Sequence, residues 1–427
     1  MKRVVVWLLT LEARAVLLRH KPKIIAITGS VGKTTTKDVI YAVLTETLHV
    51  RKSEKSLNSD IGVPLTILGL ENAWKNPLLW ALNLIRGLSI LIQKNSYPAW
   101  LVLEVGADRP GDIRKIARWL KPDIVVITGV PEIPVHVEFF RTPLELAQEK
   151  RALAEHMKEE GRLILNGDDA RMVEMCAEFK EATITYGFDN KNDWYASHSV
   201  IGYEKKRPTG VRFKANHRGL AIPVSVFGAI GRPRVHAALA AFAVADVVGV
   251  DAASVAPALS RWVPPPGRMR VIKGVNGSTI IDDTYNSSPA AALSALDTLK
   301  EVKATRRIAV LGDMLELGKY AAEAHKTIGV NAAQSADQLF TVGFRSRATG
   351  EAALDAGMLD GNIREYEQNE SRRAGEELAK ELQEGDVVLV KGSQSMRMER
   401  AVERLMAEPE KAVELLVRQE PEWLLKP

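Results

Sequence analysis

The chain has 427 residues, of which 46 % are hydrophobic and 26 % are charged, so it has room for two or three ordinary globular domains and is neither disordered nor fibrous. Its formal net charge of +5 and pI near 9.0 suit anionic ligands such as nucleotides, or an anionic membrane face. The basic residues are spread along the chain, so no nucleic-acid partner is expected. The single cysteine, Cys176, excludes a disulfide framework and indicates a reducing, cytoplasmic compartment.

Two apolar segments lie near the start of the chain. Residues 1–22 are expected to form a short amphipathic helix, whose apolar part, Val4–Leu18, lacks the cleavage site of a signal peptide. The second segment, Pro77–Ile92, is shorter than the roughly 20 residues that span a bilayer. Because basic residues flank both, peripheral membrane contact through 4–18 and 77–92 is one hypothesis; packing in a core or against a partner is the other. Polar residues interrupt both segments: Glu12, Arg14, Asn83 and Arg86.

The strongest local pattern is the sequence TGSVGKTT at Thr28–Thr35. It follows an apolar stretch of strand type, Lys23–Thr28, and precedes a helical pattern, which is the context of a phosphate-binding loop. Gly29 and Gly32 allow the tight turn that points backbone N–H groups at phosphate oxygens, and the following helix adds its dipole. Within this loop, Ser30, Lys33, Thr34 and Thr35 are the candidate polar contacts to phosphate or magnesium.

The remaining chain divides at a proline-rich segment, VPPPG at Val263–Gly267. Before it, strands alternate with helices, which predicts a mostly parallel sheet, and Tyr186–Val226 adds short antiparallel strands. After it, the alternation restarts as a Rossmann-like domain. The sequence therefore predicts an α/β protein with an N-terminal helix (1–22), a central phosphate-loop domain (23–263) and a C-terminal α/β domain (264–427).

With this loop, the chain resembles the Mur ligase family, and within it the members that add D-alanyl-D-alanine to a muramoyl-tripeptide. The resemblance covers nearly everything from residue 23 onward. It is carried, in the family's order, by TGSVGKTT, LNSDIGVPLTIL (Leu57–Leu68), LEVGADRPGDI (Leu103–Ile113), HVEFF (His136–Phe140), EKRAL (Glu149–Leu153), LNGDD (Leu165–Asp169), DDTYNSSP (Asp282–Pro289), LGDMLELG (Leu311–Gly318) and VKGSQSMRME (Val390–Glu399).

The resemblance assigns roles to three residues of the central domain. Glu104 ends an apolar strand, where a carboxylate is a hard magnesium ligand, although a solvated strand-end carboxylate would look the same. His136 matches a ligand of a second magnesium ion, whereas a lone histidine is more often structural. Lys150 matches the family lysine that is carbamylated, a modification that needs a buried amine; its sequence alone resembles a helix-surface lysine. With Thr34, these residues would bind ATP and two magnesium ions.

Further candidates contact the nucleotide or the substrates. Arg268 follows the proline-rich hinge and would reach ATP phosphates on domain closure. Asp282 would meet the nucleotide, or would simply cap its strand. The substrate contacts implied by the family's motifs are Asn58, Asp313, Glu316, Lys391 and Ser393.

Two departures from the family are expected to matter. Because the strand that leads into the phosphate loop begins at Lys23, we expect the family's N-terminal UDP-binding domain to be absent. The stretch that contacts adenine, which contains two asparagines in the family, is here Gly231–Ala237, with the sequence GRPRVHA and no asparagine.

The resemblance implies an ATP-dependent ligase that forms an amide through an acyl-phosphate, acts on small carboxylate and amine substrates, and is compatible with a homo-oligomer. The alternatives are a related ligase for a lipid-linked, folate-like or tetrapyrrole carboxylate, a nucleotide-binding partner subunit, and a membrane-surface scaffold.

Overall fold

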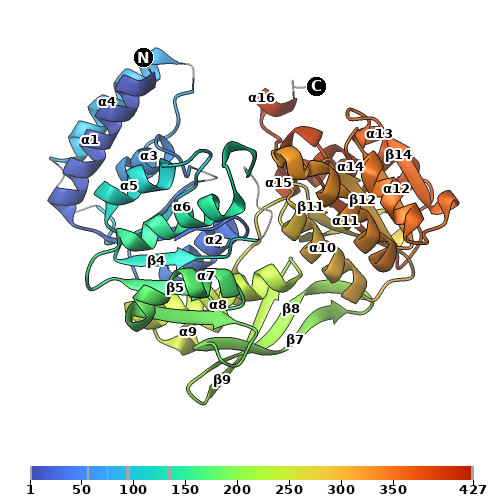
Figure 1. Cartoon of the computed structure of the whole chain (residues 1–427), viewed down its shortest axis with the longest axis horizontal. Helices are drawn as coiled ribbons and strands as arrows, with labels where there is room; N and C mark the ends of the chain where they lie inside the picture. The colour runs from blue at the N-terminus through green and yellow to red at the C-terminus, as the bar shows by residue number, and fades with distance from the viewer. Residues whose placement is uncertain (1, 55–56, 75, 93–96, 132–136, 425–427) are drawn as a thin grey trace.

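The computed structural model describes residues 2–54, 57–74, 76–92, 97–131 and 137–424. It has two α/β domains side by side, with long antiparallel strands running beneath both (Figure 1). The predicted α/β class, with a mostly parallel sheet, added antiparallel strands and a second α/β domain, is confirmed.

A nine-stranded sheet, with strand order β2-β3-β1-β4-β5-β6-β7-β8-β9, forms the central domain. Strands β2 to β7 pair in parallel around β1, and β7, β8 and β9 pair antiparallel. The strand bounds are β1 Lys23–Thr28, β2 Val50–Lys52, β3 Trp100–Glu104, β4 Ile124–Ile127, β5 Arg162–Asn166, β6 Thr183–Gly187, β7 Trp194–Glu204, β8 Arg207–His217 and β9 Leu220–Phe227.

Both faces of the parallel part are buried, which explains why its strands are apolar throughout. Ile25 and Ile27 of β1 belong to one core with α2, α8 and α9, whereas Ile24 and Ala26 belong to a second core with α1, α3, α5, α6 and α7. The helix bounds are α1 Lys2–His20, α2 Lys33–Leu44, α3 Gly62–Leu68, α4 Pro77–Ile90, α5 Asp112–Leu120, α6 Pro143–Glu155, α7 Ala170–Met175, α8 Arg232–Val248 and α9 Ala252–Arg261.

The C-terminal domain is a six-stranded sheet with order β10-β11-β15-β12-β13-β14, parallel except for β10. Helices α10, α11 and α12 cover one face, and α13 and α14 cover the other. The bounds are β10 Arg270–Lys273, β11 Thr279–Asp283, α10 Pro289–Glu301, β12 Arg307–Gly312, α11 Ala321–Ser335, β13 Gln338–Val342, α12 Arg347–Asp355, β14 Ile363–Tyr366, α13 Ser371–Ala379, β15 Val387–Lys391, α14 Glu399–Leu405, α15 Ala412–Leu415 and α16 Pro421–Leu424.

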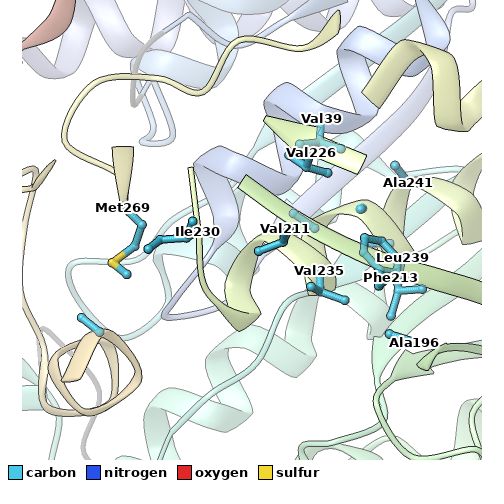
Figure 2. Close-up of a cluster of buried hydrophobic side chains, with 14 of the residues drawn as sticks. Val39, Ala196, Val211, Phe213, Val226, Ile230, Val235, Leu239, Ala241 and Met269 are labelled. Atoms are coloured by element: carbon cyan, nitrogen blue, oxygen red, sulfur yellow. The ribbon is translucent and has the colours of Figure 1, made fainter. Parts of the chain in front are cut away.

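The connection between the domains is part of a continuous apolar cluster. Met269, just before β10, lies next to Ile230, which precedes α8, and the Ile230 N–H donates to the Met269 carbonyl at 3.2 Å (Figure 2). Behind them, Val211, Val226 and Val235 continue the cluster into the central domain. The expected boundary at 263/264 falls in the segment between α9 and β10.

Helix α4, which contains most of the second apolar segment, is exposed along most of its length: only Asn83 and Gly87 of its residues are buried. In the part of the chain that the structure describes, no helix combines the length and apolar character needed to cross a bilayer.

Candidate active site

The loop after β1 has the backbone that its glycines predict. Gly29 has φ 141° and Gly32 has φ 85°, values that side chains rarely tolerate. A Cβ at Gly29 would lie 2.1 Å from the Thr128 hydroxyl at the end of β4, so this position cannot accept a larger residue without movement. Gly32 then starts α2, whose first N–H groups open onto the loop.

Two polar side chains of the loop are placed for an anion. The Ser30 hydroxyl is buried and has no hydrogen-bond partner among the described residues, a costly arrangement that a phosphate oxygen would relieve. Lys33 Nζ donates to the Gly29 carbonyl at 2.8 Å, which holds the ammonium over the loop. Loss of hydration lowers the Lys33 pKa, while the nearby Glu104 carboxylate raises it. The loop residues therefore fit a nucleotide phosphate.

Glu104 is the centre of the polar cluster at the carboxyl edge of the sheet. It ends β3 and pairs in register with Ile27 of β1, so it lies beside the loop. The Thr34 hydroxyl donates to its Oε2 at 3.0 Å, Asn58 Nδ2 donates to its Oε1 at 3.0 Å, and Lys37 Nζ lies 3.8 Å from Oε2. A hydroxyl and a carboxylate at this spacing are oxygen donors of the kind that magnesium takes beside nucleotide phosphates.

His136, the predicted second magnesium ligand, lies outside the described residues. Within the described part of the chain, no three His, Cys, Asp or Glu side chains form a metal-holding group. Thr34 and Glu104 would be the oxygen donors nearest the loop, and phosphate oxygens and water would complete a magnesium shell.

Lys150 lies inside the domain, on α6, and not on a helix surface. Its side chain is 3 % exposed and borders a cavity of about 30 Å³ that Ser30, Lys33 and Asn58 also line. Burial lowers its pKa to about 7, helped by the charge of Lys33 and opposed by that of Glu149. A large neutral fraction at physiological pH is what carbamylation requires.

Its neighbour Glu149 has a structural role. Both carboxylate oxygens accept backbone N–H groups at the start of α5, from Gly111 at 3.0 Å, Ile113 at 2.7 Å and Arg114 at 3.1 Å. This capping satisfies the free N–H groups of α5 and fixes α6, and with it Lys150, against that helix.

The C-terminal domain supplies the opposite wall. Arg268 lies with its guanidinium carbon 3.8 Å from the centre of the Tyr285 ring, and its Nη2 is 3.5 Å from the Thr34 hydroxyl. The predicted approach of this hinge arginine to the phosphate loop is therefore present in the structure.

Between the domains lies a cavity of about 560 Å³, a size typical of small-ligand sites. Residues of both domains line it. The predicted residues among them are Ser30, Gly32, Lys33, Thr34, Asn58, Glu104, Arg268, Glu316 and Ser393.

Asp282 is not brought to this cleft. It is 0 % exposed, and its carboxylate accepts the Gly267 N–H at 2.9 Å, the Thr284 N–H at 3.2 Å and the Thr284 hydroxyl at 2.6 Å. Burial raises its pKa to about 6. The arrangement fits the alternative in which Asp282 organises its own strand end, because its partners are Gly267 of the hinge and Thr284, which directly follows β11.

Lys391 and Asp313 are also occupied elsewhere. Lys391 Nζ donates to Asp283 Oδ2 at 2.5 Å and to the Asn286 carbonyl at 2.9 Å. Asp313 is 2 % exposed and accepts the Ser346 N–H at 2.7 Å. Neither lines the cavity, so both support its wall from behind and do not face a substrate in this arrangement.

The region expected to hold adenine has a different set of side chains. The Arg232 guanidinium carbon lies 3.7 Å from the centre of the Phe188 ring, and His236 Nε2 lies 2.8 Å from Asp168 Oδ2. Arg234 turns inward instead, donating from Nη1 to the Thr35 hydroxyl at 2.9 Å and from Nη2 to the Arg268 carbonyl at 2.6 Å. Thr35 is therefore a contact of Arg234 and lies behind the cavity wall.

Sequence reasoning missed Arg234, Asp108, Tyr285 and Trp423. Asp108 lies within the sequence GADRPGD, which marks it as a strand-end acid, and it lines the cavity. Tyr285 lies inside DDTYNSSP. Trp423 of α16, near the C-terminal end of the chain, also lines the cavity, and no local sequence pattern indicates this role.

A phosphate loop with an acidic strand end, faced across a cleft by an arginine at the start of a second α/β domain, defines a two-domain phosphate-loop enzyme. The chain belongs to the Mur ligase family. The Mur ligase middle domain model matches residues 27–79 and 83–245, and the Mur ligase, glutamate ligase domain model matches residues 267–394.

Individual relatives agree with this assignment. The UDP-N-acetylmuramoyl-tripeptide–D-alanyl-D-alanine ligase of Bacillus subtilis is 30 % identical over 399 residues, covering 93 % of this chain and 79 % of that protein. The ligase of the same name from Synechocystis is 30 % identical over 90 % of this chain and 75 % of its own length. Among solved structures, the MurF ligase of Thermotoga maritima in complex with ADP aligns with a TM-score of 0.75 and 25 % identity, over 95 % of this chain and 84 % of that one.

Proposed function

We propose that this protein is an ATP-dependent ligase that joins a D-alanyl-D-alanine-like amine to a muropeptide carboxylate through an acyl-phosphate, in peptidoglycan synthesis. The observation that carries the proposal is the cluster of Lys33, Thr34 and Glu104 at the phosphate loop, with Arg268 of the second domain on the same cavity. The relatives named for this reaction and the structure solved with ADP support it.

Each side chain of the cluster has a task in such a reaction. Lys33, Ser30 and the loop N–H groups bind and orient the phosphates, so that a substrate carboxylate can attack the terminal one in line. Thr34 and Glu104 would hold magnesium, which supplies charge neutralisation at the transferring phosphoryl group. Arg268 adds a cation from the other domain, so that closure both completes the charge pattern and excludes water from the acyl-phosphate.

The second half of the reaction uses the C-terminal wall. Glu316 and Ser393 line the cavity, which supports a role for them in contacting an incoming amine that attacks the acyl-phosphate and expels phosphate. Asn58 donates to Glu104 and lines the same cavity, which supports a role for it in contacting the substrate. No nucleophilic side chain is required, because positioning and electrostatic stabilisation lower the barrier.

A carbamate on Lys150 is part of the proposal. Reaction of the neutral amine with carbon dioxide forms an N–C bond, releases the amine proton to solvent and gives a carboxylate-like anion beside Lys33 and Asn58, where the cavity of about 30 Å³ lies. That anion would be an oxygen donor for magnesium in addition to Thr34 and Glu104, as His136 would be a nitrogen donor. We propose that the reaction takes place in the cytoplasm, where ATP is available, and at the inner membrane face if the carboxylate substrate is lipid-linked.

The test is phosphate release from ATP across pairs of carboxylates and amines, with the amide product identified by mass spectrometry. The carboxylates are a UDP-linked muramoyl-tripeptide, a lipid-linked muropeptide, a folate and a tetrapyrrole, and the amines are D-alanyl-D-alanine and glutamate. Phosphate release that depends on a muropeptide together with D-alanyl-D-alanine, and is lost in Lys33→Ala, supports the proposal. Phosphate release with only a folate or a tetrapyrrole would show that the carboxylate substrate is not a muropeptide. Nucleotide binding without phosphate release for any pair would show that the protein is a nucleotide-binding subunit and not a ligase.

A further inference from the structure

Helix α4 is apolar on both of its faces. On the inner face, Trp80, Leu84 and Ile90 pack against the core, and Asn83 and Gly87 are buried. On the outer face, five large apolar residues are exposed, by 79 % for Leu78, 47 % for Leu79, 38 % for Leu82, 65 % for Ile85 and 54 % for Leu88. An ordinary surface helix has polar residues on this outer face.

Helix α1 adds a second exposed stripe. Val4, Trp7, Leu11 and Leu18 are 58 %, 61 %, 41 % and 76 % exposed and lie along one helix face at spacings of three, four and seven positions. The two helices pack side by side at the edge of the central domain that faces away from the C-terminal domain (Figure 1). We name these stripes of α1 and α4 together the helix-pair surface.

The helix pair is attached to the domain without using this surface. On its inner side, α1 buries Leu9, Ala13 and Val16 in the core that it shares with α3 and the sheet. Gly87 allows α4 to approach α1 closely, since a Cβ there would lie 2.1 Å from Glu12 Oε2. The helix-pair surface is therefore not needed to hold the two helices in place, and exposed apolar residues gathered in this way mark interaction sites.

The charges of the helix pair point to the class of partner. Arg14, Arg19, Lys21 and Arg86 are exposed on α1, on the residue that follows it and on α4. The only acidic residue in the sequences of the two helices is Glu12, and it is buried. Glu71, whose carbonyl accepts from Asn83 of α4, is an exposed acid just before that helix. On the two helices themselves, the exposed apolar side chains, tryptophan among them, are accompanied by exposed cations and no exposed acid, which matches the interfacial region of an anionic bilayer.

We propose that the helix-pair surface binds an anionic lipid bilayer, with both helices lying in the interfacial plane. A surface that binds a protein of ordinary composition is expected to carry both acidic and basic residues around its apolar stripes. A surface that binds lipid phosphates is expected to carry cations there. Insertion across the bilayer is not part of the proposal, since neither helix has the length and apolar character to span it. The binding does not depend on catalysis, because none of these residues lines the cleft.

The test is co-sedimentation of the full chain with phosphatidylglycerol–phosphatidylcholine vesicles and with pure phosphatidylcholine vesicles, at low and at high salt. We expect binding to the anionic vesicles that weakens with salt. The double variant Leu82→Ser/Ile85→Ser and the charge reversal Arg14→Glu/Arg86→Glu each lower partitioning by about tenfold or more. The matched control is Phe344→Ser/Val413→Ser, which removes apolar residues that are 72 % and 77 % exposed on the C-terminal domain and leaves binding unchanged.

Three results would overturn the proposal. One is no co-sedimentation with anionic vesicles at low salt. Another is equal binding by the wild type and both helix-pair variants. The third is a dimer in light scattering that Leu82→Ser/Ile85→Ser converts to a monomer while vesicle binding is absent, which would assign the surface to a second copy of the chain. Melting temperatures of all variants confirm that they are folded, and ATP-dependent phosphate release, measured separately, reports on the ligase proposal alone.

Discussion

The Arg234 guanidinium donates from Nη1 to the hydroxyl oxygen of Thr35 at 2.9 Å, although the two residues are 199 positions apart in the chain. The same guanidinium donates from Nη2 to the carbonyl of Arg268. One buried side chain on α8 thus joins the helix of the phosphate loop to the hinge residue that faces it. Burial lowers the Arg234 pKa to about 10, with Asp283 opposing the shift, so the side chain still carries its charge at neutral pH.

We predict that Arg234→Gln lowers kcat about tenfold, because hydrogen bonds from a charged group contribute about 1.5–3 kcal/mol and the shorter amide cannot reach both partners. Arg234→Lys is expected to be no better, since one ammonium cannot bridge Thr35 and Arg268. Steady-state ATP turnover with saturating substrates measures this. The control is Arg261→Gln, an exposed arginine at the end of α9. Wild-type kcat in both Arg234 variants would show that the bridge does not position Arg268.

We predict that Lys33→Ala and Glu104→Ala each lower the turnover of ATP-dependent amide formation by about two to three orders of magnitude. Lys33 is the cation over the loop, and Glu104 is the carboxylate that Thr34 and Asn58 hold in place. Turnover is measured at saturating magnesium, with Lys191→Ala, an exposed lysine on a turn, as the control. Retention of wild-type turnover by either variant would mean that the site is elsewhere.

Lys150→Ala is predicted to lose activity by about a hundredfold, and acetate or formate should restore part of it by occupying the position of the carbamate. Since the pKa of Lys150 is lowered to about 7, the reactive neutral amine is present above that pH and is lost as the pH falls below it. Wild-type activity should therefore fall below pH 7, and added bicarbonate should raise the activity more at pH 8 than at pH 6.

Lys158→Ala, which removes an exposed lysine just after the same helix, is the control. It should respond to bicarbonate as the wild type does, and acetate or formate should not raise its activity. A mass spectrum of the native protein, prepared in bicarbonate and magnesium, that shows no added carbon dioxide would contradict the modification.

Much of the site was predictable because parallel strands bring their carboxyl ends to one edge. Lys33 and Thr34 follow β1 and Glu104 ends β3, and β1 and β3 are neighbours, so residues far apart in sequence meet there. The glycines of the loop were predictable for a different reason. The tight turn between β1 and α2 needs backbone angles that residues with side chains rarely adopt.

The remaining features depend on packing that no local pattern encodes. Asp282 and Lys391 end strands, as residues that contact a nucleotide or substrate often do. In the folded protein, however, Asp282 accepts a hydrogen bond from Gly267 and Lys391 donates one to Asp283, behind the wall of the cleft. The sequence does not show these tertiary contacts. In α4, the apolar stripe alone could not show which way it faces. The pair Asn83 and Gly87, four positions apart, was the available signal, since a small residue on one face indicates close helix contact there.

The last prediction concerns Glu12, which is buried between α1 and α4 with no partner for Oε2 among the described residues. Burial raises its pKa from 4.5 to about 7. For an acid whose folded-state pKa is raised, the folded protein binds more protons than the unfolded chain between these values. Its stability therefore falls as the pH rises from about 4.5 to 7 and stays lower above that range.

Glu12→Gln removes this ionisation and keeps the shape of the side chain. We expect the variant to melt about 2–4 °C above the wild type at pH 8, corresponding to about 1 kcal/mol once solvent screening is allowed for, and to match it at pH 5. The control is Glu46→Gln, which removes an exposed carboxylate at the end of α2. Two results would contradict this prediction: a Glu12→Gln melting temperature equal to that of the wild type at pH 8, or one raised equally at pH 5 and pH 8. Either would show that burial of the ionised Glu12 carboxylate does not destabilise the folded protein. Vesicle binding measured on the same Glu12→Gln protein should be unchanged, because the substitution lies on the inner side of the helix pair and leaves Leu82, Ile85 and the exposed arginines in place.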